Sequence, residues 1–496
     1  MTLSEIHEKI NQIEKNDDIT SFNKNGIDFW PTIRILIYSR LHRRHYKSSN
    51  ESFSTVSSSS YFINKLKRIA KTILSFDFKI FSLRKQNALF LSDGVSFVSD
   101  REGYIDRFCY PIEEYLDTKH WSSILVTPTC THKKEMLSNN VFCYKFIVDI
   151  LSIFYKLVRL LQKKRSRKVV EVIEKINNEL GSDLIRYEDV KSFIDRTVIH
   201  KIVFEYLLLI VKPKIIFIVE YYSIQGQAIS YVANKMNIKC IDMQHGAMYK
   251  THPAYASWLN LPKNRYNTFP SAFYVWDELG EKHIGEWFDG DVYLGANIYL
   301  EKNIQWNLNE AQYKNEYISC LLLAKKNLLD EPRKKILVTL QTDIFTAEDI
   351  SKFLNQITWG NNYFWLIRLH PSMMSEINAL AKHFSDFENI DLVCASKCPL
   401  YKLLPNCDLH ITHSSSSSIE AYFYGVKTIL TSNSGIEIVE ESIDKTHYTY
   451  IDGLESINES DVTNMLVNGN NNIVSKSIDR LSNAYASIDK LLLSVN

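Results

Sequence analysis

The sequence lacks a strong charge of either sign. Its 58 lysine and arginine residues balance 57 aspartate and glutamate residues, which leaves a formal net charge of +1. Bulk charge therefore indicates neither a nucleic acid nor an acidic protein as a partner. Hydrophobic residues make up 45% of the chain and charged residues 23%, which is the composition of an ordinary globular protein.

Long apolar runs and cysteine patterns are also missing. No apolar run approaches the roughly 18 residues of a membrane-spanning helix, and the segment Met1–Ile6 does not resemble a signal peptide. The eight cysteines are scattered, and the close pair Cys394 and Cys398 lacks the second His or Cys pair that would complete a zinc site. We therefore expect a cytoplasmic protein whose thiols are reduced.

Three motifs of nucleotide and metal enzymes are absent from the sequence. It contains no Gly-x-x-x-x-Gly-Lys-Ser/Thr loop, no Gly-x-Gly-x-x-Gly after a strand and no His-Glu-x-x-His. P-loop and dinucleotide sites are therefore not expected. Asp289-Gly-Asp291 resembles the acidic metal motif of some sugar transferases, but it lies in an expected turn before an apolar run. We expect no metal there.

Short apolar runs alternate with helical patterns along most of the chain. The runs lie at 88–91, 122–127, 214–220, 239–244, 272–276, 292–294, 335–340, 363–368, 390–393, 408–412 and 427–431. This strand–helix–strand order predicts parallel sheets. Because 496 residues are too many for one ordinary core, we predict an α/β protein with two doubly wound, Rossmann-like domains.

The predicted domain organisation has four parts. The first is a peripheral helical extension with a serine-rich loop, and the last is a helical tail. The boundary between the two α/β domains follows a turn-rich segment at 260–270. The parts span 1–85, 86–268, 269–450 and 451–496.

Two segments combine apolar and basic residues at helical spacing. They lie at 61–74 and 150–168, and the second ends in a cluster of lysines and arginines. Such helices can lie on an anionic membrane surface. The same pattern is equally typical of a core-packed helix with a solvated face, so both interpretations stay open.

The most informative stretch is His410–Glu420. An apolar run ends in five serines, Ser414–Ser418, and a helix-forming segment with an acid, Glu420, in its first turn follows. A helix N-terminus has unpaired N–H groups and the positive end of the helix dipole, so it favours a phosphate. One serine is enough to cap a helix. Five favour a phosphate site.

Other polar residues follow the predicted strands. Because ligands of open parallel sheets bind outside the carboxyl ends of the strands, these residues are site candidates. Pro371 restricts His370 to extended conformations and holds it beside Arg368 at the end of a strand, where both side chains could contact a phosphate. The other strand-end candidates are Asp93, Glu220, His245, Ser414 and Ser415.

Three of these motifs together resemble a known family. Gln244-His245-Gly246, Arg368-x-His370-Pro371 and Ser414-Ser415-Ser-x-x-Glu420-Ala-x-x-x-Gly425 resemble the bacterial surface-polysaccharide glycosyltransferases of GT-B fold. This group includes transferases that build capsule or lipopolysaccharide from CMP-Kdo or CMP-sialic acid and, more distantly, teichoic-acid polyol-phosphate polymerases. The resemblance covers residues 88–440.

The resemblance implies a site, a donor and an acceptor. His370, Ser414 and Ser415 would contact the nucleotide phosphate and Glu420 the ribose. The donor would be a nucleotide-activated sugar, preferably a CMP-linked acidic sugar, and the acceptor a growing polysaccharide or a lipid-linked glycan. As in GT-B enzymes generally, no metal or other cofactor is expected, and a peripheral position on the inner face of the plasma membrane would fit a lipid-linked acceptor.

The catalytic base should come from the first α/β domain. Asp93, Glu220 and His245 are the candidates for deprotonating the acceptor hydroxyl. The sequence has Gln244-His-Gly-Ala-Met where the polyol-phosphate enzymes have Trp-His-Gly-Thr-Pro. This difference counts against a polyol-phosphate polymerase. A CDP-polyol phosphotransferase and a nucleotide-sugar epimerase remain alternatives.

Overall fold

A computed structural model describes most of the chain. The described residues are 2–46, 76–99, 103–129, 133–138, 140–160, 165–309, 331–341, 347–356, 358–439, 441, 446–467 and 475–495. The serine-rich loop and the first basic amphipathic segment, at 61–74, lie outside them.

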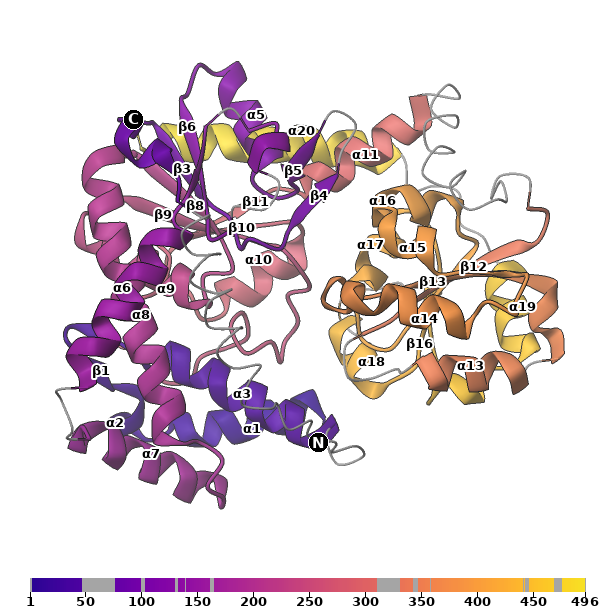
Figure 1. Ribbon diagram of the computed structural model, residues 1–496, viewed down its shortest axis with the longest axis horizontal. Coiled ribbons are helices and arrows are strands. Elements are labelled where there is room, and N and C mark those ends of the chain that lie inside the picture. Colours follow the sequence, from indigo (N-terminus) through magenta and orange to yellow (C-terminus); the bar gives the residue numbers. More distant parts are fainter. Residues whose placement is uncertain are drawn as a thin grey trace, which may run out of the picture.

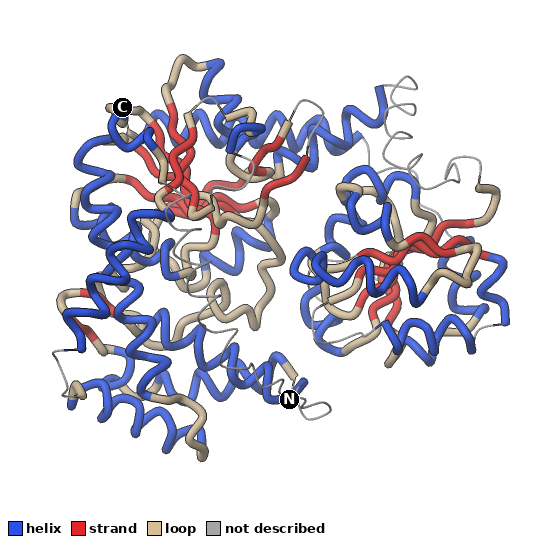
Figure 2. The backbone as a smooth tube through the Cα atoms, viewed as in Figure 1, coloured by secondary structure: helices blue, strands red, loops and turns tan. Residues whose placement is uncertain are grey.

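The first α/β domain contains a seven-stranded parallel sheet (Figures 1 and 2). The strand order is β11-β10-β9-β8-β3-β6-β7. Every residue of the central strand β8 is buried, as expected for a parallel sheet covered on both faces. The strands are β3 (Ala88–Leu91), β6 (Ser123–Thr127), β7 (Val141–Cys143), β8 (Ile215–Val219), β9 (Lys239–Met243), β10 (Ala272–Val275) and β11 (Asp291–Leu294).

Helices cover this sheet. Figure 1 shows α8 and α9 beside each other, and they make an extensive contact. The long apolar patterns in 145–210 form α6 and α8, which were expected as helices. The helices of this domain are α5 (Tyr110–Thr118), α6 (Lys145–Leu160), α7 (Arg167–Leu180), α8 (Tyr187–Val211), α9 (Ile224–Lys235), α10 (Glu278–Gly285) and α11 (Ile298–Asn309).

The second α/β domain contains a six-stranded parallel sheet in the order β14-β13-β12-β15-β16-β17. Its strands are β12 (Lys334–Thr339), β13 (Tyr363–Arg368), β14 (Ile390–Asp391), β15 (Leu409–Thr412), β16 (Thr428–Leu430) and β17 (Tyr448–Tyr450). Its principal helices are α13 (Ala347–Gln356), α14 (Ile377–His383), α15 (Val393–Lys397), α16 (Leu400–Leu403), α17 (Ser417–Phe423), α18 (Asn433–Val439) and α19 (Glu459–Val467).

Two strands belong to a different sheet from the one expected. The sequence prediction assigned the runs at 272–276 and 292–294 to the second domain. Instead, Ala272–Tyr274 pair with Ile241–Met243 of β9, and β11 pairs with β10, so both strands extend the first sheet. Apolar runs specify strands but not the sheet that they join, which explains the error. We propose that the domain boundary lies between β11 and β12.

The chain ends pack onto the first domain. The C-terminal helix α20 (Ser475–Leu493) contacts α11 and β11, and its Ala484, Ile488 and Leu491 join the core on one face of the first sheet. The yellow α20 in Figure 1 accordingly lies along the first domain. The expected helical tail at 451–496 is therefore not one unit. Its helix α19 packs on the second domain, where Val462 joins the core, whereas α20 packs on the first.

The N-terminal helices are not peripheral. Helices α1 (Leu3–Glu14) and α3 (Trp30–Tyr46) contribute Ile6, Ile10 and Trp30 to the main core of the first domain. Arg34 of α3 forms a fully buried ion pair with Glu14, 2.6 Å long, and its guanidinium stacks 4.0 Å above the ring of Trp258. These contacts correct the expectation of a peripheral extension, which rested on the helical pattern alone.

Two further expectations concern thiols and membranes. Five described cysteines are free and buried, but Cys143 is disulfide-bonded, so the expectation of reduced thiols is wrong at this residue. The scattered cysteine spacing gave no sign of a pair. Within the described ranges, every helix is too short or too polar to cross a bilayer.

Candidate functional site

Three predicted residues lie at the carboxyl edge of the first sheet. Asp93 follows β3, Glu220 follows β8 and His245 follows β9. Because β8 lies between β3 and β9, these strand ends are neighbours. The structure brings two of the side chains close together: Glu220 Oε1 lies 3.6 Å from His245 Nε2.

Glu220 has an unusual backbone and an unusual acidity. Its φ of +62° lies in the left-handed region, which is uncommon for a residue with a side chain and often marks functional sites. Burial, and secondarily the negative charge of Asp93, raise the pKa of Glu220 to about 7. Glu220 can therefore exchange a proton near neutral pH, as a general base must.

His245 lies in an aromatic pocket. Its Nε2 is 3.1 Å from the hydroxyl of Tyr222, its Nδ1 is 3.5 Å from the hydroxyl of Tyr255, and its ring is nearly perpendicular to that of Phe108. Burial lowers the pKa of His245 to about 4, although the charge of Asp93 opposes the shift. His245 is therefore neutral at physiological pH.

Asp93 is already engaged by its own turn. Its Oδ1 accepts hydrogen bonds from the N–H groups of Val95 and Ser96, both 2.8 Å long, and its Oδ2 accepts the Ser96 hydroxyl. Its charge nevertheless acts on Glu220 and His245. Asp93 therefore fits an electrostatic role better than that of a proton acceptor.

The serine run forms the turn between β15 and α17. The sequence placed the helix at Ile419, but α17 begins at Ser417, and Ser417 and Ser418 are buried. Ser414 donates from its N–H and its hydroxyl to Gln341 Oε1, at 2.8 and 3.2 Å. Ser415 Oγ accepts the N–H of Ser417 at 3.2 Å. The run thus orders its own turn and leaves Ser414 and Ser415 half-buried.

Arg368 and His370 have different surroundings. Arg368 Nη1 donates to the carbonyls of Ala395, at 2.6 Å, and Cys398, so this part of the guanidinium binds the C-terminal end of α15. His370 lies past the end of β13 with an exposed side chain, and its carbonyl accepts the N–H of Met373. Partial burial lowers the pKa of His370. The phosphate roles of both residues stay predictions.

Arg107, which sequence reasoning missed, connects the two halves. Its Nη1 lies 3.2 Å from Oε1 of Glu420 in the second domain. In the first domain its positive charge helps to lower the pKa of His245, and across the cleft it acts in the same direction on Arg368. The Arg107 guanidinium therefore interacts both with the carboxyl edge of the first sheet and with the helix that follows the serine turn. No motif surrounds Arg107 in the sequence.

The chain holds Arg107 in place through its neighbour. Asp106, at the end of the short strand β5 (Tyr104–Asp106), accepts the N–H groups of Phe108 and Cys109 at 3.0 Å each. Its other oxygen accepts the hydroxyl of Ser92, the residue after β3. Arg107 is thereby fixed beside the carboxyl edge of the first sheet.

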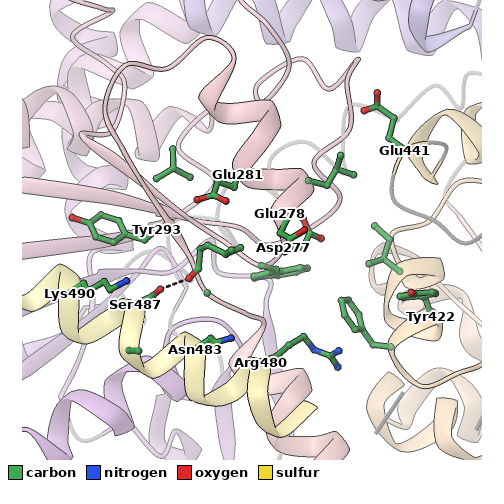
Figure 3. A pocket seen from close by; sticks show the side chains of 18 of the residues that line it. Asp277, Glu278, Glu281, Tyr293, Tyr422, Glu441, Arg480, Asn483, Ser487 and Lys490 are labelled. Carbon is green, nitrogen blue, oxygen red and sulfur yellow. Dashed lines mark hydrogen bonds between the residues drawn. The ribbon is translucent and has the colours of Figure 1, made fainter. Parts of the chain in front are cut away.

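A cavity of about 760 Å³ lies between the first domain and α17 of the second, and its lining includes none of the predicted site residues (Figure 3). Glu278 and Glu281 lie on one wall, Arg480 and Lys490 line the α20 wall, and Tyr422 comes from α17 of the second domain. The volume is within the range of small-molecule sites. Because α17 also carries Glu420, the cavity and the ion pair share one element of the second domain.

Comparison with known proteins shows the fold. No family model and no curated protein matches the sequence. The solved UDP-GlcNAc 2-epimerase of Neisseria meningitidis, bound to UDP-GlcNAc, aligns over 82% of this chain and 99% of its own, with 12% identity and a TM-score of 0.51. With the two parallel sheets, this likeness confirms the predicted GT-B fold of two Rossmann-like domains facing a cleft.

Other solved structures align less closely. The UDP-GlcNAc 2-epimerase of Methanocaldococcus jannaschii covers 80% of this chain and 99% of its own at 12% identity, with a TM-score of 0.47. The glycosyltransferase SnogD of Streptomyces nogalater covers 83% and 100% at 10% identity, with a TM-score of 0.43.

Proposed function

We propose that this protein is a metal-independent glycosyltransferase that moves a sugar from a nucleotide-activated donor to a surface polysaccharide or a lipid-linked glycan. The observation that carries the proposal is the ion pair between Arg107 and Glu420. It links the first domain, which carries the Glu220–His245 pair, to α17, the helix that follows the serine turn of the second domain. A transferase needs a base on one side of its cleft and leaving-group stabilisation on the other.

The second domain would bind the donor. In this proposal Glu420 binds the ribose, and His370, Ser414 and Ser415 contact the phosphate. Arg107 and Arg368 add positive charge close to Glu420. This charge would stabilise the nucleotide as it leaves, which is where negative charge develops in the transition state.

The first domain would activate the acceptor. Glu220 is the preferred base, because its pKa of about 7 leaves a substantial ionised fraction at neutral pH while making the carboxylate more basic. His245 lies beside it and is neutral, so it can accept or donate a hydrogen bond. Asp93 raises the pKa of Glu220 through its charge.

A nucleotide panel tests the proposal. Thermal unfolding is followed with CMP, CDP, UDP and GDP, and CMP is expected to stabilise the protein most. His370→Ala should weaken CMP binding. Stabilisation by UDP or GDP alone would refute the CMP-linked donor, and indifference to all four nucleotides would refute nucleotide-sugar chemistry altogether.

A nucleotide-sugar epimerase is the second candidate. The Neisseria meningitidis protein with the same fold is a UDP-GlcNAc 2-epimerase. An epimerase converts its nucleotide sugar without an acceptor, whereas a transferase releases the nucleotide only as the acceptor is glycosylated. A CDP-polyol phosphotransferase would instead consume CDP-glycerol or CDP-ribitol and release CMP.

We also propose that the protein associates with the cytoplasmic face of a membrane. Phe78 and Phe81, in the short helix η2 (Phe78–Ser82), are 76% and 81% exposed, and Phe154 of α6 is 62% exposed. The ring of Phe76 contacts Phe78 and also Phe146 of α6, which joins the two elements. We name the exposed residues Phe78, Phe81, Ile153, Phe154 and Leu157 the phenylalanine patch.

Basic residues accompany the phenylalanine patch. Lys79, Arg84 and Lys85 lie within or just after η2, and Lys156 is exposed on α6. Exposed aromatic side chains with nearby lysines and arginines suit an anionic lipid surface. The second amphipathic segment of the sequence, at 150–168, lies partly within the described residues. Its described part is divided between α6 and α7.

A further inference from the structure

A buried carboxylate lies behind the candidate site. Asp242, on β9, is completely inaccessible to solvent. Its Oδ1 accepts the N–H of Tyr221, and its Oδ2 accepts the hydroxyl of Tyr255, both at 2.8 Å. Each of its oxygens therefore has a partner, and neither faces the cleft.

Tyr255 connects this carboxylate to the imidazole of His245. The Tyr255 hydroxyl oxygen lies 3.5 Å from His245 Nδ1. A hydroxyl has one proton to donate, and the proton of Tyr255 points to Asp242. Toward His245, the Tyr255 oxygen can therefore only accept, which requires a proton on Nδ1.

The other imidazole nitrogen, Nε2, faces a hydroxyl and a carboxylate. It lies 3.1 Å from the Tyr222 hydroxyl and 3.6 Å from Glu220 Oε1. The main-chain carbonyl of Met243 also accepts a hydrogen bond from His245, which favours the protonated imidazole.

We propose that Asp242 and Tyr255 are positioning residues that hold neutral His245 with its proton on Nδ1, so that the Nε2 lone pair faces Glu220. The proton on Nδ1 leaves Nε2 as an acceptor for a hydrogen bond from protonated Glu220 or from a reacting hydroxyl. The hydrogen-bonding partner of one imidazole nitrogen selects the tautomer and so the role of the other. The consequence for catalysis rests on the proposed transferase function, but the tautomer itself does not.

The protonation of Asp242 controls the direction of this network. Burial raises the pKa of Asp242 well above its usual range, while hydrogen bonds from Tyr255 and Tyr221 oppose the shift. A proton on Oδ2 would turn the Tyr255 hydroxyl toward His245 and move the imidazole proton to Nε2. The proposed Nδ1–H tautomer is therefore the one that goes with ionised Asp242, the form that accepts a hydrogen bond at each oxygen.

Nitrogen NMR of imidazole-labelled full-length protein at pH 8 tests the proposal. The His245 signals are assigned by their loss in His245→Gln. We expect Nδ1 to give the shift of a protonated nitrogen and Nε2 that of an unprotonated one. In Tyr255→Phe the ratio of the two tautomers should change about three- to tenfold toward Nε2–H, as loss of one hydrogen bond implies.

Tyr221→Phe is the matched control. Tyr221 is equally buried and packs against Tyr255, but its hydroxyl donates to the carbonyl of Ala254. Its loss should lower stability and leave the tautomer ratio unchanged. A wild-type His245 protonated on Nε2, or a ratio in Tyr255→Phe equal to that of wild type, would overturn the proposal.

Activity measurements separate this inference from the proposed function. If the protein transfers sugar, Tyr255→Phe should lower kcat with little change in the KM for the donor, while Tyr221→Phe keeps both near wild type. If the tautomer changes as expected but no donor is turned over, the positioning network stands and the transferase proposal fails.

Discussion

Arg107 of the first domain and Glu420 of the second form an ion pair across the cleft, with 3.2 Å between Nη1 and Oε1. The arginine side chain is 30% exposed and the glutamate 16% exposed. Partly exposed ion pairs contribute roughly 0–1 kcal/mol to stability. A bound nucleotide could therefore break this ion pair with little loss of stability. Its ribose would then hydrogen-bond to Glu420, and its phosphate would contact Arg107.

The first prediction concerns Glu420→Gln. Loss of the carboxylate should weaken CMP binding about 10- to 100-fold, because hydrogen bonds to charged groups contribute roughly 1.5–3 kcal/mol. Titration calorimetry measures the affinity. Glu114→Gln is the control, since Glu114 pairs with Lys302 in a shorter and more exposed contact. Equal affinities in both variants and wild type would exclude Glu420 as a nucleotide ligand.

The second prediction concerns the pH dependence of kcat. If ionised Glu220 is the base, activity should rise as the pH increases through about 7. Asp93→Asn removes a negative charge that raises the pKa of Glu220, so the rise should move to lower pH by about one unit. The comparison is made with Asp289→Asn, whose carboxylate lies on the surface and pairs with Arg265. A rise at the same pH in all three proteins would rule out Glu220 as the titrating base.

The third prediction concerns stability. Glu220 ionises near its ordinary pKa of 4.5 in the unfolded chain but near 7 in the folded protein. Between these values the unfolded state loses its proton first, so the folded state loses stability as the pH rises. Glu220→Gln cannot ionise and should become more stable than wild type by about 1–2 kcal/mol at pH 8, allowing for the partial exposure of Glu220.

Urea unfolding at pH 4 and pH 8 measures this difference. The advantage of Glu220→Gln should be smaller at pH 4, where most of the wild-type carboxylate is protonated in both states. Glu205→Gln provides the control, because Glu205 lies on α8, is also half-buried, and pairs with Lys201 and Lys235 away from His245. A constant difference between wild type and Glu220→Gln at both pH values would contradict the raised pKa.

Local patterns predicted the strands and part of the candidate site. The apolar runs of β8 and β9 identified buried parallel strands, and the rule that ligands bind at their carboxyl ends pointed to Glu220 and His245. Strand pairing was not predictable, because β10 and β11 have the same apolar pattern in either sheet. A strand pairs with whichever sheet edge lies next to it in the folded protein. That position depends on the whole fold and not on the local sequence.

The remaining site residues depend on contacts between distant segments. Arg107 meets Glu420 across 313 positions of sequence, and Arg480 of α20 reaches Glu301 across 179. Neither arginine lies in a motif, so no local pattern marks it. The contact of Arg368 with the end of α15 was missed for the same reason, because its carbonyl partners Ala395 and Cys398 follow another strand.

The fourth prediction concerns the phenylalanine patch. Wild-type protein should sediment with vesicles of phosphatidylcholine and phosphatidylglycerol, less with phosphatidylcholine alone, and less at high salt, because the nearby cations are attracted to anionic lipid. The double variant Phe78→Ser/Phe154→Ser should bind these vesicles at least about tenfold more weakly, since burying one such side chain contributes roughly 1.5–3 kcal/mol.

A double variant on the C-terminal helix controls for this change. Ile478 and Leu493 of α20 are also exposed, at 63% and 76%, but lie outside the phenylalanine patch. Ile478→Ser/Leu493→Ser removes a similar amount of exposed apolar surface and should sediment with anionic vesicles as wild type does. If the two double variants bind equally well, or if wild type does not bind anionic vesicles, η2 and α6 do not form a membrane-binding surface. The acceptor would then have to reach the cleft without membrane binding through the phenylalanine patch.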